Sequence, residues 1–374
     1  MIRKFLALFL PLLYISLSIS AQDTDTIRLL DAKDAITGAT RMELYLPLLQ
    51  NKAVAVVANQ SSIMDNGTHL IDTLLSHHIN IVKIFTPEHG FRGTAEAGAY
   101  VASGVDAKTG LSIVSLYGKN KKPTAEQLQG IDILLFDLQD VGCRFYTYIS
   151  TMTYVMQAAA QNNIPVIVLD RPNPNGFYVD GPVLEPENSS FVGLHQVPIV
   201  YGLTIGEYAM MVNGEHWLGD SLECKLAVIP LGSYDRNAIY RLPVKPSPNL
   251  PNWEAVYLYP SLCLFEGTDV SVGRGTKSPF QIYAHPMLSD TVNLVEYAHN
   301  YRVNDNKINL SWIIDTRQKA AADEKFFNNY FIKLVGVADL QQKINSGMSE
   351  DEIRSSWQTG IDNYLKIREK YLIY

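Results

Sequence analysis

The sequence is poor in cysteine and has no excess of positive charge. Its three cysteines, Cys143, Cys224 and Cys263, are far apart and in no metal-type spacing, which excludes a disulfide-rich scaffold. One disulfide with a spare thiol fits an oxidising compartment, but three buried small hydrophobic side chains are the favoured interpretation. The formal net charge is -7, and we expect no nucleic acid partner, because affinity for phosphates comes from clustered Lys and Arg.

Nucleotide-binding and metal-binding motifs are also missing. No Gly-x-Gly-x-x-Gly follows the first predicted strand and no P-loop occurs, so a nucleotide would find no phosphate cradle. No second His or Cys stands at ligand spacing from His89, which favours an orienting or structural role for His89 over a metal ligand. We therefore expect neither a cofactor nor a metal.

The N-terminus has the organisation of a secretory signal peptide. A short basic start precedes the apolar run 5–15, and small residues follow up to Ala21. A retained membrane anchor is the alternative, but Pro11 interrupts the run, which is short for a span of about 20 residues. We predict that residues 1–21 are removed and that the rest, without a later membrane span, is periplasmic or secreted.

Strand and helix patterns alternate along the first half of the chain. Apolar, partly β-branched runs predict strands near 52–58, 80–85, 111–116, 131–137 and 164–170, and helical spacing lies near 69–75, 124–128 and 150–161. This alternation predicts an α/β fold with a Rossmann-like, mostly parallel, doubly wound sheet within residues 22–176.

The pattern changes after residue 176, where loops rich in Pro and Gly take over. One helix is expected near 204–217, begun by a capping box of Thr204 and Glu207, and one strand near 223–230. Helical spacing returns in the segments 323–334, 340–346 and 349–357. We interpret residues 177–374 as a smaller, loop-rich α/β subdomain with C-terminal helices.

A polar loop, 85–93, directly follows the second predicted strand. In open α/β sheets, ligands bind beyond the carboxyl ends of the strands, where this loop would lie. Glu88 has Phe85 and Phe91 as neighbours, so partial desolvation would favour its protonated form and suit it to general acid catalysis. A salt bridge between Glu88 and Arg92 is the purely structural alternative.

Two further predicted strands end in dense polar segments, 137–148 and 170–176. Because parallel strands end side by side, these segments and the loop 85–93 can form one pocket for a polar, anionic ligand. Glycoside hydrolysis needs two carboxylates around one substrate; Asp140, Asp137 and Asp170 all qualify as the second, and we select Asp140. For Asp137 and Asp170, helix capping is an equally favoured interpretation. Further candidate binding residues here are Gln139, Arg144, Arg171, Asn173 and Tyr146, the last being either a core side chain or part of a sugar-stacking wall.

A glycine-rich loop near 266–276 is a further candidate. Its glycines permit close contact with a ligand, and its polar residues are Glu266, Ser271, Arg274 and Thr276. A tight turn with Arg274 as a surface cation is the structural alternative. The segment 247–251, Ser-Pro-Asn-Leu-Pro, is a second loop of this kind.

Taken together, five segments resemble the NamZ family of exo-β-N-acetylmuramidases: 86–93, 137–148, 170–174, 266–268 and 271–276. The resemblance runs from about residue 30 to the C-terminal segment and implies a Rossmann-like domain joined to a smaller subdomain, with the active site in the cleft between them. It also implies hydrolysis of terminal, non-reducing β-N-acetylmuramic acid (MurNAc) from muropeptides or MurNAc-containing disaccharides. Glu88 stands at the position of the family's catalytic glutamate.

The resemblance adds two expectations about the substrate site. MurNAc carries a lactyl carboxylate, and Arg92, Arg144, Arg171 or Arg274 can bind such a group bidentately. Relatives have a longer stretch after the segment that ends at Pro286, so a more open site, altered specificity or reduced activity is expected here. The alternatives to this hydrolase are a non-catalytic muropeptide or acidic-sugar binding protein and a hydrolase for another β-hexosamine.

Overall fold

The computed structural model describes residues 27–88, 90–91, 103–219, 221–301, 306–321 and 325–374. The predicted signal peptide, residues 1–21, lies outside the described residues, as do the candidate binding residues His89 and Arg92. The three cysteines are each buried with a free thiol, which confirms their interpretation as small hydrophobic side chains.

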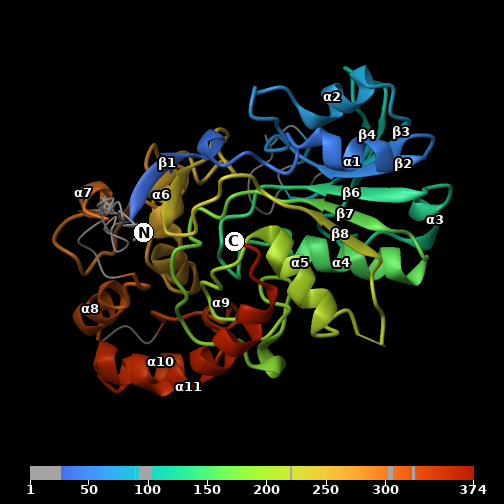
Figure 1. Cartoon of the computed structure of the whole chain (residues 1–374). Helices are drawn as coiled ribbons and strands as arrows, with labels where there is room; N and C mark the ends of the chain where they lie inside the picture. The colour runs from blue at the N-terminus through green and yellow to red at the C-terminus, as the bar shows by residue number, and fades with distance from the viewer. Residues whose placement is uncertain (1–26, 89, 92–102, 220, 302–305, 322–324) are drawn as a thin grey trace, which may run out of the picture.

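A seven-stranded sheet forms the centre of the molecule (Figure 1). Its order is β4-β5-β3-β2-β6-β7-β8, and all neighbouring pairs are parallel except β4-β5 at one edge. The strands are β2 (Val54–Ala58), β3 (Ile81–Thr86), β4 (Gly104–Val105), β5 (Ser112–Ser115), β6 (Ile133–Asp137), β7 (Val166–Leu169) and β8 (Leu226–Ile229). Every residue of β2, β6 and β7 is buried, as in strands covered on both faces. The predicted α/β fold with a mostly parallel sheet is confirmed.

Helices cover both faces of this sheet (Figure 1). Alternate residues of β2 enter two different cores, because successive strand side chains point to opposite faces. Val54 and Val56 belong to the core that includes side chains of α1 and α2, whereas Ala55 and Val57 belong to the core that includes α4 and α5. The helices are α1 (Met42–Leu49), α2 (Leu70–Ser76), α3 (Ala125–Leu128), α4 (Tyr148–Gln161) and α5 (Ile205–Gly214).

The sheet extends beyond the boundary expected at residue 176. We predicted α5 and β8 as parts of a second subdomain, but β8 pairs in parallel with β7 and completes the main sheet. The connection between β7 and α5 is long and irregular, and its Pro and Gly residues hide the continuing alternation of helix and strand. The capping box predicted for Thr204 and Glu207 is present at the start of α5.

The remaining chain adds helices and two small sheets beside the main sheet (Figure 1). β1 (Arg28–Asp31) pairs in parallel with β9 (Ala238–Arg241), and β10 (Ile282–Tyr283) pairs antiparallel with β11 (Val292–Asn293). The helices are α6 (Trp253–Leu262), α7 (Val295–His299), α8 (Ser311–Lys319), α9 (Tyr330–Val335), α10 (Leu340–Asn345) and α11 (Glu350–Arg368), with 3-10 helices at Ala32–Asp34, Pro186–Asn188, Cys263–Gly267 and Glu369–Tyr371.

The helix expected at 323–334 is shorter than predicted. Only α9, from Tyr330, is helical among the described residues of that range, because Phe327 forms a bridge with Thr268 and the Asn328 N–H donates to the carbonyl of Gly267 at 3.0 Å. This extended pairing fixes the start of α9 against the 3-10 helix Cys263–Gly267.

Candidate active site

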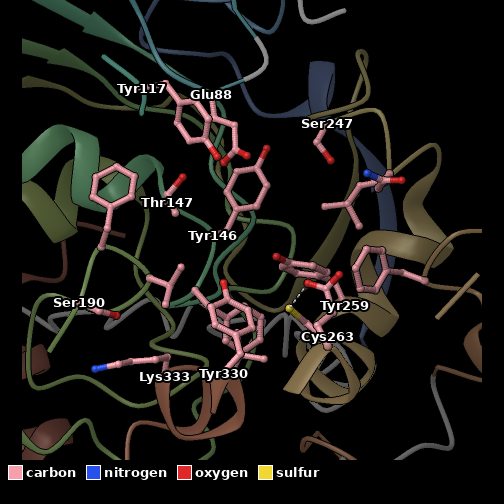
Figure 2. A pocket seen from close by; sticks show the side chains of 18 of the residues that line it. Glu88, Tyr117, Tyr146, Thr147, Ser190, Ser247, Tyr259, Cys263, Tyr330 and Lys333 are labelled. Atoms are coloured by element: carbon pink, nitrogen blue, oxygen red, sulfur yellow. Dashed lines mark hydrogen bonds between the residues drawn. The ribbon is translucent and has the colours of Figure 1, made fainter. Parts of the chain in front are cut away.

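A cavity of about 860 Å³ lies beyond the carboxyl ends of the central strands (Figure 2). The loops after β3, β5 and β6 form one side, and α6, the 3-10 helix Cys263–Gly267 and α9 form another. The lining residues are Glu88, Tyr117, Gly118, Lys121, Phe145, Tyr146, Thr147, Ser190, Phe191, Val192, Ser247, Asn249, Leu250, Tyr259, Cys263, Glu266, Arg274, Phe280, Tyr330, Lys333 and Leu334. Of the candidates named above, the cavity brings together Glu88, Tyr146, Glu266 and Arg274, and the candidate loop 247–251 contributes Ser247, Asn249 and Leu250.

Glu88 stands two residues beyond the end of β3 and is half-buried. β3 and β5 are neighbours in the sheet, with Thr86 opposite Ser115, so the loop after β5 brings Tyr117 to the same edge. Figure 2 shows Glu88, Tyr117 and Tyr146 at one end of the cavity. The strand-end position predicted for Glu88 therefore places its carboxylate in the ligand space.

Two tyrosines build the wall near Glu88. The Tyr146 hydroxyl donates to the carbonyl of Pro246 at 2.9 Å, and its ring meets Tyr148 edge-on with centroids 4.8 Å apart. The Tyr148 hydroxyl accepts from Asn59 Nδ2 at 2.7 Å. Burial raises the pKa of Tyr146 well above its usual range, and nearby groups, Glu88 among them, raise it further. Tyr146 is thus a neutral core side chain that also lines the cavity.

Glu266 is the other carboxylate of the described cavity lining. Its Oε1 accepts from Arg274 Nε, and its Oε2 accepts from the Cys263 thiol at 3.5 Å. The Arg274 guanidinium also lies 5.1 Å from the centroid of the Phe280 ring. Burial opposes the charge of Arg274, but the hydrogen bond and charge of Glu266 outweigh it and raise the Arg274 pKa. These contacts fix the orientation of Glu266 at the cavity wall.

Tyr330, the first residue of α9, lines the same cavity as both carboxylates. Burial is the largest cause of its raised pKa, and the charges of Cys263, Glu266 and Glu88 raise it further. Glu88, Glu266 and Tyr330 thus line one cavity. Glycoside hydrolysis uses two carboxylates around one substrate.

Asp137 and Arg171 do not reach the cavity but form a buried ion pair with each other. Arg171 Nε and Nη2 donate to the two carboxylate oxygens at 2.6 and 2.8 Å, and Nη2 also donates to the carbonyl of Ile63. The residues are 0% and 3% exposed. The pair joins the ends of β6 and β7, so Arg171 is not available to a substrate carboxylate.

Asp140, selected as the second catalytic carboxylate, is also turned into the protein. Its Oδ2 accepts from the Gly142 N–H at 2.6 Å and from the Tyr201 hydroxyl. Burial raises the Asp140 pKa to about 7, against the opposing effect of the Tyr201 hydrogen bond. Asp140 is absent from the lining of the cavity that holds Glu88, because the glycine after Val141, with φ 75°, folds the chain back onto its carboxylate.

Arg144 is fully buried and holds the main chain rather than a ligand. Nη1 donates to the carbonyls of Pro182 and Val197 at 2.9 and 2.7 Å, and Nη2 donates to those of Leu334 and Val335 at 3.0 and 2.8 Å. Burial lowers its pKa to about 10. Arg144 thus ties the loop after β6 to the end of α9, and a role in carboxylate binding is excluded.

Asp170, Gln139 and Asn173 have structural roles as well. Asp170 accepts from the Gly206 N–H in the first turn of α5 at 2.8 Å and from the hydroxyls of Thr204 and Tyr374, both at 2.7 Å, which agrees with the capping interpretation. Burial raises its pKa to about 6. Gln139 donates to two backbone carbonyls at 2.8 Å, and Asn173 donates to a third.

Some residues of the glycine-rich loop 266–276 line the cavity, and others form the tight turn that was the structural alternative. Ser271 and Thr276 are exposed and outside the cavity lining, and Thr276 Oγ1 donates to the carbonyl of Gly273 at 2.6 Å within a tight turn. Gly273 has φ 74°, which favours glycine at that point. Arg274, between them, nevertheless reaches the cavity.

Several lining residues were not predicted. Tyr117 and Lys121 follow β5, so the strand-end rule that identified Glu88 also points to this loop. Phe191, Tyr330 and Lys333 carry no such signal, because tertiary packing alone brings their segments to the cavity. Among the described residues, no group of His, Cys, Asp or Glu is arranged to hold a metal ion, and no helix there is long and apolar enough to cross a membrane.

Two family models match the chain. The N-terminal model of exo-β-N-acetylmuramidase NamZ matches residues 54–254, and the C-terminal model matches 257–309 and 301–374. The chain belongs to the exo-β-N-acetylmuramidase NamZ family. The two matched regions meet at the start of α6, and the cavity lies between them, with Glu88 from the first and Glu266 from the second.

Relatives within the NamZ family cover most of the chain. The peptidoglycan β-N-acetylmuramidase NamZ of Bacillus subtilis (strain 168) is 38% identical over 371 residues, covering 88% of this chain and 89% of the relative. Solved structures of two DUF1343 family proteins from Bacteroides fragilis NCTC 9343 have TM-scores of 0.82 and 0.77 at 41% and 30% identity. Each comparison covers 91% of this chain and 99% of the solved chain.

These comparisons bear on the stretch expected to be missing after Pro286. The C-terminal NamZ model matches in two pieces that overlap at 301–309. The two solved relatives have no long additional stretch there, because the chain spans 99% of each.

Proposed function

We propose that this protein is an exo-acting glycoside hydrolase that releases terminal, non-reducing β-linked MurNAc from peptidoglycan fragments. The observation that carries the proposal is the cavity shared by Glu88 and Glu266 at the junction of the two NamZ regions. The similarity to a peptidoglycan β-N-acetylmuramidase supports the substrate class. A muropeptide or a MurNAc-containing disaccharide is the expected substrate.

In this mechanism Glu88 is the general acid that protonates the leaving glycosidic oxygen. Its half-buried carboxyl group lies near Tyr146, whose own hydroxyl donates to a backbone carbonyl and so does not compete with Glu88 as the proton donor. Glu266 takes the second carboxylate role in place of Asp140, either as the base that takes a proton from the attacking water or as the nucleophile that attacks the anomeric carbon. Arg274 and Cys263 orient Glu266 for that role.

Substitution of Glu88 tests the assignment. We expect Glu88→Gln to lower kcat/KM for a MurNAc–GlcNAc disaccharide by about 10²–10⁴-fold, the usual contribution of general acid catalysis. Glu126→Gln, an exposed change in α3, is the matched control and should leave turnover unchanged. Unaltered turnover in Glu88→Gln, with sugar release followed by chromatography, would remove Glu88 from the mechanism.

We also propose that the protein is exported. The basic start and apolar run of residues 1–21 support this, and a peptidoglycan substrate is consistent with it. Expression with the native N-terminus and sequencing of the mature protein should place the first residue near position 22. Recovery of the chain with residues 1–21 attached in the cytoplasmic fraction would contradict export.

A further inference from the structure

Three cationic side chains line the described part of the cavity: Lys121, Arg274 and Lys333. Arg274 is paired with Glu266, whereas neither lysine forms an ion pair with a carboxylate of the described residues. Lys121 and Lys333 therefore present positive charges that an anionic ligand of this cavity can meet.

Lys121 is held in place through one face of α4. Its ammonium lies 4.4 Å from the centroid of the Phe191 ring, and that ring stacks on Tyr154 with centroids 5.9 Å apart and planes at 17°. The next residue in the chain, Lys122, donates to Gln157 Oε1 at 2.7 Å. Tyr154 and Gln157 are three positions apart on α4 and share a face. One face of α4 thus contacts both the loop that carries Lys121 and the Phe191 ring that lies against the Lys121 ammonium.

Phe191 stands at the tip of a tight turn. Ser190 and Gly193 exchange two backbone hydrogen bonds of 2.9 Å, which projects Phe191 and Val192 into the cavity. A cation–π contact holds the ammonium against the Phe191 ring, and the ring covers only one side of the ammonium. The remaining N–H donors of Lys121 can bind a carboxylate.

The two lysines come from different segments of the cavity wall. Lys121 belongs to the same loop after β5 as Tyr117, which Figure 2 shows at the Glu88 end of the cavity. Figure 2 shows Lys333 at the opposite end, with Tyr330. A carboxylate on the sugar that is cleaved lies within one ring of the scissile bond and hence near Glu88. The position of Lys333 at the other end leaves Lys121 as the candidate.

We propose that Lys121, held over Phe191, binds the lactyl carboxylate of the substrate and makes the protein prefer MurNAc over N-acetylglucosamine (GlcNAc), which lacks the lactyl group. The identity of the sugar rests on the proposed function. Of the four arginines that the sequence offered for this role, Arg144 and Arg171 are buried in structural contacts, Arg274 is paired with Glu266, and Arg92 lies outside the described residues.

The test measures recognition and turnover separately. Calorimetry gives the affinity for free MurNAc and free GlcNAc, and aryl β-glycosides of both sugars give kcat/KM. We expect Lys121→Met to weaken MurNAc binding by about 10- to 100-fold, the effect of losing one hydrogen-bonded charge pair, and to change GlcNAc binding by less than about twofold. Lys121→Arg should retain part of the preference. Lys119→Met, which removes an exposed charge from the same loop, is the matched control.

Three results would overturn this inference: equal weakening for both sugars in Lys121→Met, loss of the preference in Lys333→Met instead, or no preference for MurNAc in the unchanged protein. Free MurNAc and GlcNAc have no glycosidic bond to hydrolyse. Calorimetry with these sugars therefore tests the role of Lys121 even if the protein shows no turnover. Absence of turnover on both glycosides, with the MurNAc preference intact, would contradict the hydrolase proposal while leaving the Lys121 assignment standing.

Discussion

Carboxylates follow three strands of the main sheet, yet they differ in what surrounds them. Glu88 stands two residues beyond β3 and lines the cavity, whereas Asp137 is the last residue of β6 and Asp170 directly follows β7. Asp137 and Asp170 are both 0% exposed and engaged by protein donors. A side chain at the level of the sheet finds partners on neighbouring strands and loops. Glu88, in the loop beyond its strand, faces the ligand space instead.

This difference separates a scaffold group from a cavity group. The scaffold group is Asp137, Asp140, Arg144, Asp170 and Arg171, and the cavity group is Glu88, Glu266, Lys121 and Arg274. Substitutions in the scaffold group should change the free energy of unfolding. Substitutions in the cavity group should change catalysis with little effect on stability.

The largest stability effect is expected for Asp137→Asn. The change leaves the Arg171 guanidinium buried without its counter-charge, and breaking a buried ion pair in this way costs about 3–5 kcal/mol. Urea denaturation measures the loss. Glu88→Gln is the comparison and should alter stability by less than about 1 kcal/mol; equal losses in the two variants would erase the distinction between the groups.

Arg144→Met is expected to cause the second largest loss in the free energy of unfolding. Four buried backbone carbonyls lose their donor, and we expect a loss of about 2–4 kcal/mol, since removal of the buried charge offsets part of the cost. KM should also rise, because Arg144 holds the end of α9, which carries Tyr330 and Lys333. Arg241→Met, at an exposed position, is the control. A variant as stable as that control would show that Arg144 is not part of the scaffold.

Asp140 should lower the free energy of unfolding as the pH rises, which is the opposite of the usual effect of a carboxylate that is paired in the folded state. Burial raises its folded-state pKa to about 7, above an unfolded value of about 3.9. Its contribution to stability is therefore fully present below pH about 4 and is lost as the pH rises through about 7. The side chain of Asp140→Asn cannot ionise. The free energy of unfolding of this variant, relative to that of the unchanged protein, should therefore rise by about 1–3 kcal/mol from pH 5 to pH 8. Denaturation at both pH values measures this, and a constant difference would contradict the buried, raised-pKa carboxylate.

The smallest effect is expected for Ser271→Ala. Its side chain is exposed and lies outside the cavity lining, although its loop also carries Arg274. We expect kcat/KM to change by less than about twofold and stability by less than about 0.5 kcal/mol. Arg274→Met in the same assay should reduce kcat/KM, because it frees Glu266; a larger effect at Ser271 would reverse the assignment.

The sequence predicted the sheet and the Glu88 position because both follow from local patterns. Buried β-branched runs fix strands such as β2, and a polar loop after β3 marks the ligand edge. The direction of the Asp137 and Asp140 side chains depends on Arg171 and Tyr201, which come from distant segments, so local patterns could not reveal it. The approach of α9 depends likewise on packing against the 3-10 helix Cys263–Gly267, where a side chain on Gly267 would meet the backbone of α9 at 2.4 Å.

The role of Glu88 as general acid is tested most directly by comparing substrates with different leaving groups. kcat/KM should be measured for Glu88→Gln and the unchanged protein on a MurNAc–GlcNAc disaccharide and on a MurNAc β-glycoside with a strongly acidic phenol, which departs without protonation. We expect the about 10²–10⁴-fold loss on the disaccharide to shrink by at least about tenfold on the activated glycoside. Equal losses on both substrates would contradict proton donation by Glu88.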